Sequence, residues 1–247
     1  MCISKSFSKG FELFKKNFWT LISLCFSRLA FAMIIGILGV VLLAPLMSSG
    51  ISQIISNPGL VFESSSALQY GAYFVFYIFL LVGIVALAMP ALAYPHLAGA
   101  VLATKKKKFS FQNGLELLKK HYVILLVDGF IYSLLTLYLF IQSALLFLSY
   151  PLSGLLMFLA SIYLTIRLAF WDILALKGEE HPLKASWKLT KKSFWAALGF
   201  IVLSNLLIEV TSLVPLVGLL FGILTIPFVS TSKAVFVSEL SGKKRSR

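Results

Sequence analysis

Four charged side chains in or next to long apolar stretches of the sequence are candidates for a site, because an ionised group in such a stretch is costly and is usually either functional or paired. They are Arg28, Asp128, Arg167 and Asp172. Arginine can hold a phosphate with two parallel hydrogen bonds, so one hypothesis is an anion or lipid-headgroup site. The alternative is that two cations and two anions pair and fix the packing of a helix bundle. Arg167 and Asp172 are five residues apart and lie on different faces of one helix, so we expect Asp128 to pair with Arg167.

The sequence has no arrangement typical of a catalytic or metal centre. Its three histidines, His96, His121 and His181, are far apart and lack the spacing of zinc ligands. Neither a phosphate-binding P-loop nor a Gly-x-Ser-x-Gly nucleophile motif occurs. We therefore expect no catalytic residue, no metal and no cofactor. A lipid-modifying enzyme is the least favoured alternative.

The apolar stretches themselves predict transmembrane helices. Hydrophobic residues make up 59% of the 247 and charged residues only 13%, whereas soluble domains are about 45–50% apolar and about 25% charged. About 20 apolar residues suffice to cross a bilayer as a helix. Six stretches qualify: Leu29–Met47, Ala72–Ala103, Tyr122–Tyr150, Pro151–Leu176, Phe194–Val214 and Leu216–Val237. The predicted fold is an all-α polytopic membrane bundle of six transmembrane helices.

The net charge of +13 is distributed unevenly. Basic residues gather before the first span, between spans two and three, between spans four and five, and at the end of the chain. The other three connections contain no lysine or arginine: 48–71, 149–153 and 212–216. By the positive-inside rule both termini are cytoplasmic in a multi-pass protein of the cell membrane. The charge therefore indicates topology and attraction to anionic lipids, and we expect no nucleic-acid partner.

Three stretches of the chain align with one another: 10–19, 114–123 and 186–195. Each has a leucine, a lysine pair two residues later and an aromatic residue two positions after the pair. The pairs are Lys15-Lys16, Lys119-Lys120 and Lys191-Lys192. These patterns predict a single membrane domain built as three repeats of an amphipathic helix followed by a helical hairpin, over residues 1–104, 105–176 and 177–247.

The first copy shows why these segments belong at a membrane surface. Phe7, Phe11, Phe14 and Phe18 follow the spacing of one helix face, and most of the lysines lie off that face. Such a helix lies in the headgroup plane with its lysines directed toward lipid phosphates, so the six paired lysines are predicted to contact headgroups. The alternative is that these segments extend straight transmembrane helices into the cytoplasm.

Prolines are the remaining feature with functional meaning. Pro90, Pro95 and Pro227 are predicted to kink their helices. Kinked helices open cavities in transporters. An alternative function is therefore a small transporter or channel whose central path is lined by the four intramembrane charges.

The repeated small-x-[Glu/Lys]-Leu-x-Lys-Lys-x-aromatic motif, with the Leu-Ala-x-Lys sequence before the next copy, resembles a broad group of six-helix membrane proteins. The group includes the membrane domain of some glycerophosphoryl diester phosphodiesterases. The resemblance implies fold and location; without a soluble phosphodiesterase domain it implies no catalytic residue. Together the patterns predict a non-enzymatic membrane protein that binds or organises anionic lipids, a protein partner or a second copy of the chain at the cytoplasmic leaflet.

Overall fold

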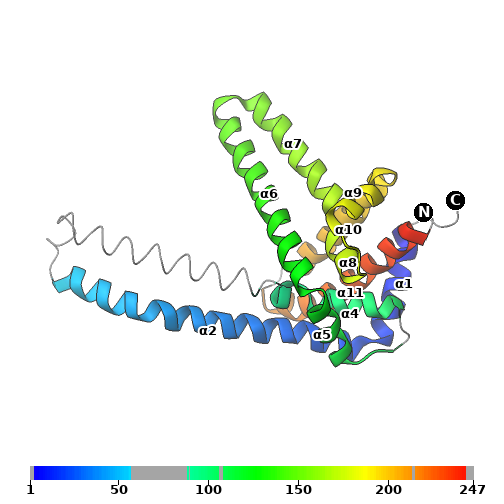
Figure 1. Cartoon of the computed structure of the whole chain (residues 1–247), viewed down its shortest axis with the longest axis horizontal. Helices are drawn as coiled ribbons and strands as arrows, with labels where there is room; N and C mark the ends of the chain where they lie inside the picture. The colour runs from blue at the N-terminus through cyan, green and yellow to red at the C-terminus, as the bar shows by residue number, and fades with distance from the viewer. Residues whose placement is uncertain (1–2, 57–87, 89, 106–107, 213–214, 243–247) are drawn as a thin grey trace. The chain divides into compact units, whose positions relative to one another are not determined.

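The computed structural model describes residues 3–56, 88, 90–105, 108–212 and 215–242. Across these residues the regular structure is helical and contains no strand, which confirms the predicted all-α class for this part of the chain. The helices are α1 (Ile3–Lys16), α2 (Phe18–Ser56), α4 (Pro95–Lys105), α5 (Phe111–Lys120), α6 (Tyr122–Ser149), α7 (Pro151–Leu168), α8 (Trp171–Leu176), α9 (Pro182–Lys191), α10 (Phe194–Ser212) and α11 (Pro215–Gly242) (Figure 1).

The chain divides into two compact units. One unit combines residues 1–27 with residues 93–247, and the other comprises residues 28–92. The second unit holds most of α2, a helix of 39 residues that begins in the first unit. All the contacts described below belong to the first unit.

Several helices are long and apolar enough to cross a membrane. Four stretches of the described chain meet this condition: Phe18–Val41, Tyr122–Ser149, Pro151–Leu176 and Gly222–Gly242. A fifth results if α9 and α10, which meet at a bend of 109°, are counted as one broken span. These helices are the kind that a membrane protein requires. The predicted second span lies largely outside the described residues.

Each of the three aligned stretches contains a break between a short helix and a long apolar one. α1 ends at Lys16 and α2 begins at Phe18; α5 ends at Lys120 and α6 begins at Tyr122. In the third stretch α9 ends at Lys191 and α10 begins at Phe194, with two residues between them. At the start of α5, Ser110 and Asn113 form a reciprocal capping box, and this fixes where that helix begins.

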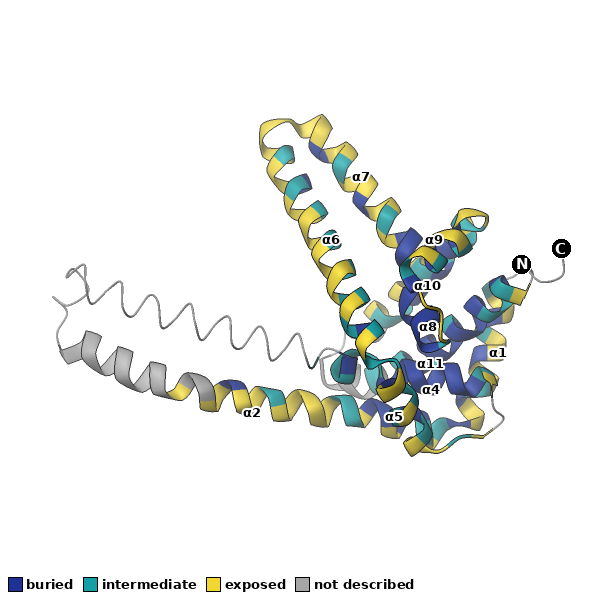
Figure 2. Ribbon diagram, in the orientation of Figure 1, coloured by how far each residue is buried: buried dark blue, intermediate teal, exposed yellow. Residues whose placement is uncertain are grey.

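The core of the first unit is formed by α4, α8 and the C-terminal half of α11, which are mostly dark blue in Figure 2. The rings of Phe200 and Phe236 stack with their centroids 4.6 Å apart, and Phe170 lies 5.5 Å from Phe236. All three side chains are at most 1% exposed. Aromatic packing of this kind adds to the free energy gained from burial.

The hairpin of α6 and α7 extends away from this core (Figure 1). Its turn is at Tyr150, and Pro151 occupies the first position of α7. Gly154 lies against the backbone of Phe147, so the two helices approach closely. Many large apolar side chains of both helices are exposed, and most of the ribbon of this hairpin is yellow in Figure 2. Exposed apolar surface of this extent is typical of a membrane or protein contact.

Candidate functional site

The three short helices each bury one stripe of residues spaced four apart. In order along the chain these are Ser6, Gly10 and Phe14 in α1, Gly114 and Leu118 in α5, and Pro182, Ser186 and Thr190 in α9. Gly10, Gly114 and Ser186 occupy the same position of the three aligned stretches. A small residue there lets each short helix lie close against another element.

Close contacts show what each stripe lies against. A Cβ atom built on Gly10 would lie 2.7 Å from the Cα atom of Ser232 in α11, and one on Gly114 would lie 2.8 Å from a methyl group of Leu24. Ser186 donates a hydrogen bond of 3.0 Å to the carbonyl of Arg167 and accepts one of 3.2 Å from the amide of Phe170. These bonds satisfy backbone groups at the break between α7 and α8.

The helices on which α1, α5 and α9 pack are related to their order along the chain. α1 packs on α11, α5 packs on α4, and α9 packs on α7 and α8. The receiving element therefore directly precedes α5 and α9 along the chain, whereas α1 lies on the last helix. α4, α8 and α11 also contact one another in the core.

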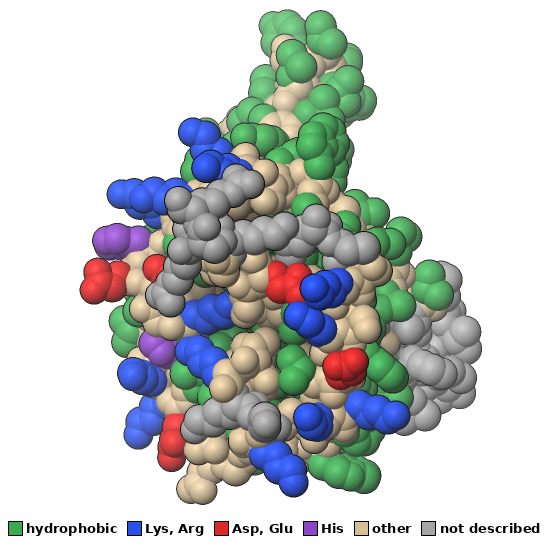
Figure 3. All heavy atoms as spheres, turned by 90° about the vertical axis from the view of Figure 1, so that its right-hand side faces the viewer, with side chains coloured by type: hydrophobic (Ala, Val, Ile, Leu, Met, Phe, Trp, Pro, Cys, Tyr) green, Lys and Arg blue, Asp and Glu red, His purple; other side chains and the backbone are tan. Residues whose placement is uncertain are grey.

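The lysine pairs that end these helices are exposed. This holds for Lys15, Lys16, Lys119, Lys120, Lys191 and Lys192. Close to two of the pairs, Trp19 and Trp195 are 78% and 79% exposed at the second positions of α2 and α10. Exposed tryptophan at the start of a long apolar helix is typical of a membrane–water interface. Figure 3 shows lysine and arginine side chains (blue) spread over one face of the molecule, with the apolar tip of the hairpin (green) projecting above them.

The phenylalanine stripe of α1 is divided between protein and surroundings. Phe7 stacks on Phe200 at 5.1 Å and also contacts Phe228, whereas Phe11 is 52% exposed. The sequence predicted one face lying on the bilayer. The structure uses that face to attach α1 to α10 and α11. Phe11 also contacts the ring of Phe228, at 5.9 Å, but it remains half exposed beside the exposed lysines of α1.

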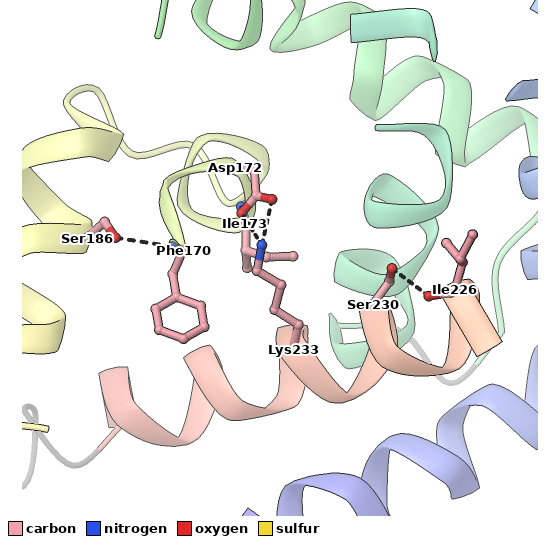
Figure 4. Close-up of polar contacts among 7 residues, drawn as sticks. All are labelled: Phe170, Asp172, Ile173, Ser186, Ile226, Ser230 and Lys233. Carbon is pink, nitrogen blue, oxygen red and sulfur yellow. Dashed lines mark hydrogen bonds and ion pairs between the residues drawn. The ribbon is translucent and has the colours of Figure 1, made fainter. Parts of the chain in front are cut away.

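Asp172 forms an ion pair that the sequence did not suggest. Lys233 of α11 donates to both carboxylate oxygens of Asp172 in α8, at 2.9 and 2.7 Å (Figure 4). The same carboxylate accepts a hydrogen bond from the amide of Ile173. The Lys233 ammonium also lies 5.9 Å from the centre of the Phe170 ring. Lys233 is the single charged residue of the predicted sixth span. An isolated charge in such a span needs a partner, so it could have indicated this ion pair from the sequence.

Arg167 is also buried, but it stacks on aromatic rings. Its Cζ atom lies 4.3 Å from the ring centre of Trp187 and 5.7 Å from that of Tyr163, and its Nε has no hydrogen-bond partner. Asp128 and Arg167, both within the described chain, do not form the ion pair that we expected. The reason is that α9 folds back over the end of α7 and covers the guanidinium with Trp187.

The structure places the other predicted residues as follows. Arg28 belongs to the second compact unit, on α2, and Pro90 lies in the same unit and is helical. α4 begins at Pro95 after a bend at Tyr94, and Pro227 lies inside α11.

In the described part of the chain, no group of three or more His, Cys, Asp or Glu side chains is placed to hold a metal ion. Within the described residues, Asp172 is paired with Lys233 and Arg167 is stacked on Trp187, while the six paired lysines of the short helices are exposed. Comparisons of the chain with protein-family models, with curated proteins and with solved structures found no match.

Proposed function

We propose that the chain is a multi-pass protein of the cell membrane with six spans and both termini in the cytoplasm. In this proposal it consists of three repeats, over residues 1–104, 105–176 and 177–247, each an amphipathic helix followed by a hairpin. Support comes from the order of contacts. α5 and α9 each pack on the end of the preceding hairpin, and α1 packs on the end of the third hairpin. Three equal units arranged in a ring would produce this pattern.

We further propose that the protein binds and organises anionic lipids at the cytoplasmic leaflet and performs no catalysis. The observation that carries this is the exposure of all six paired lysines at the ends of three helices that bury equivalent stripes. A lysine on a helix in the headgroup plane extends its ammonium to a lipid phosphate while its methylene groups stay in apolar surroundings. Each well-placed lysine adds roughly 1 kcal/mol of attraction to an anionic surface.

The buried charges favour this function over transport. Asp172 is paired with Lys233 and Arg167 is covered by Trp187, so two of the four charges that were expected to line a transport path have packing partners. A transport path would need such groups to face water or a substrate. The resemblance to the six-helix membrane domains found with some glycerophosphoryl diester phosphodiesterases agrees with this proposal for fold and location.

Native mass spectrometry of the full chain, released from a mild detergent, tests the lipid proposal. The protein is titrated with phosphatidylglycerol and with phosphatidylcholine, and bound lipids are counted. The double variant Lys119→Gln/Lys120→Gln should bind phosphatidylglycerol roughly thirtyfold more weakly, since two charges that each contribute roughly 1 kcal/mol are removed. Binding of phosphatidylcholine should not change.

The matched control is Lys5→Gln/Lys108→Gln, which removes the same charge from two exposed lysines outside the pairs. This control should retain phosphatidylglycerol binding within about threefold, because the loss in the first variant is local and not a consequence of net charge. Equal losses in the two double variants would contradict a specific role for the pairs.

A further inference from the structure

A hollow of about 860 Å³ opens between the loop that joins α8 to α9, one face of α9 and the C-terminal end of α11. Hollows of about 300–1,000 Å³ are typical of sites for small ligands. Three lysines line this one: Lys177, Lys184 and Lys188. None of them belongs to the lysine pairs discussed above.

Lys177 is the most enclosed of the three. It follows the last residue of α8, its side chain is half-buried, and its ammonium donates a hydrogen bond of 2.7 Å to the hydroxyl of Ser238. Ser238 in turn donates to the carbonyl of Ala234, so its oxygen is fixed as an acceptor for Lys177. An ammonium group has three N–H donors, and this arrangement leaves two for a ligand.

The face of α9 brings the other donors. His181, Lys184 and Lys188 recur at intervals of three and four residues, and this spacing places them on one side of the helix along the hollow. The two lysines are exposed. A ligand that reached Lys177 would therefore meet further ammonium groups at the edge.

The opposing charges are Glu179 and Glu180, which lie in the turn formed at Gly178, where φ is +92°. Both carboxylates are exposed. Their repulsion of an anion is screened by water and salt, whereas the attraction of the half-buried Lys177 is screened less. The hydroxyls of Ser238 and Ser241 donate to their own helix, so the ammonium groups are the anion-binding donors.

We propose that this hollow binds a phosphate monoester, with Lys177 as the inner contact and Lys184 and Lys188 as outer contacts. A phosphate monoester carries close to two negative charges and several strong acceptor oxygens, which suits a hollow lined by three lysines. The phosphate belongs either to a soluble compound or to a lipid headgroup. The site does not depend on lipid binding by the paired lysines.

The test uses the full chain in nanodiscs of phosphatidylcholine, titrated with glycerol phosphate in a calorimeter. We expect binding that weakens at least tenfold in Lys177→Gln and stays within about threefold in Lys177→Arg, whose guanidinium keeps the charge. The control Lys5→Gln removes an exposed lysine of α1 that does not line the hollow, and this variant should bind as the unmodified protein does.

A second arm identifies the source of the phosphate. Nanodiscs that contain phosphatidic acid present the same phosphate monoester as a headgroup. If they lower the affinity for glycerol phosphate in the unmodified protein and not in Lys177→Gln, the hollow accepts the lipid. If they leave it unchanged, the ligand is soluble. The proposal is overturned if neither phosphate binds, or if Lys177→Gln binds both as the unmodified protein does.

A pH series adds a readout that a merely structural role would not change. Burial, and then Lys105 of α4, lower the pKa of Lys177 to about 8, while Glu179 acts in the opposite direction. The other ionisable groups around the hollow are Glu180 and His181 of the loop and Lys184 and Lys188 of α9. Between pH 7 and pH 9 Lys177 loses most of its charge, so affinity should fall roughly tenfold. Lys177→Arg should show a clearly smaller fall, and an equal fall in both proteins would contradict the assignment.

Discussion

Lys233 and Asp172 lie 61 residues apart in the sequence and join α11 to α8, through hydrogen bonds of 2.9 and 2.7 Å to the two carboxylate oxygens. The pair lies where α8 meets α11, beside the ring of Phe170. Little of either side chain is exposed, with 21% for Lys233 and 11% for Asp172. A charge in this position is favourable only while its partner is present.

Removing one member of this pair should therefore destabilise the protein more than removing both. We expect Lys233→Met to lower the free energy of unfolding by about 3 kcal/mol, because the carboxylate of Asp172 is left without its cation. The double variant Asp172→Asn/Lys233→Met should recover most of that loss. Thermal unfolding of the detergent-solubilised protein measures both effects.

The second ion pair offers a control for that prediction. Lys9 lies 3.3 Å from Glu239, and the Lys9 side chain is 51% exposed. Glu239 is 20% exposed and keeps a hydrogen bond from Ser6 when Lys9 is removed. Because Lys9 itself is half exposed and its charge is screened by water, Lys9→Met should lower the unfolding temperature less than Lys233→Met does. Equal shifts in Lys9→Met and Lys233→Met would refute the special role of the buried pair.

Gly10 tests how α1 is attached. Alanine usually favours a helix over glycine by about 1 kcal/mol, but a methyl group on Gly10 would lie 2.7 Å from the backbone Cα of Ser232. We therefore expect Gly10→Ala to lower the unfolding temperature and to increase proteolysis of α1. At Gly222, where a Cβ would meet nothing within 4 Å, the same change should be neutral or stabilising. A stabilised Gly10→Ala protein would show that α1 does not lie against α11.

Arg167 and Trp187 should be energetically coupled. The guanidinium carbon lies 4.3 Å from the centre of the ring, which allows the planar group to interact with the aromatic face. Arg167→Lys and Trp187→Leu should each lower stability, and the double variant should lose about 1 kcal/mol less than the sum of the two. Thermal unfolding of the four proteins gives the coupling energy; strict additivity would mean that the contact contributes nothing.

Much of the helical pattern followed from the sequence. The Leu-x-Lys-Lys-x-aromatic spacing identified the ends of α1, α5 and α9, and each end is a break in the structure. The break could be anticipated because strongly basic helices and apolar helices prefer different environments. The bend of 109° between α9 and α10 follows less directly, since amphipathicity does not set an angle.

The partners of the buried charges could not be predicted from the sequence. Periodicity placed Asp172 and Arg167 on different faces of a helix, but it carries no information about which distant helix arrives at each face. Lys233 reaches Asp172 because α11 crosses the core beside α8, and Trp187 covers Arg167 because α9 folds back over the end of α7. Both contacts are long-range products of packing. The hollow beside Lys177 is likewise formed by three separate segments.

All three amphipathic helices must lie at the cytoplasmic face of the membrane if they are to bind lipids of that leaflet. Single cysteines at Glu12, Glu116 and Lys188 report on the three helices, and one at Tyr150 reports on the turn of the α6–α7 hairpin; all four side chains are exposed. Cys2 and Cys25 are first replaced by alanine. In intact cells a membrane-impermeant maleimide should label the Tyr150 position alone, and the other three should react only after the membrane is opened. Labelling of any of the three helices in intact cells would contradict the account.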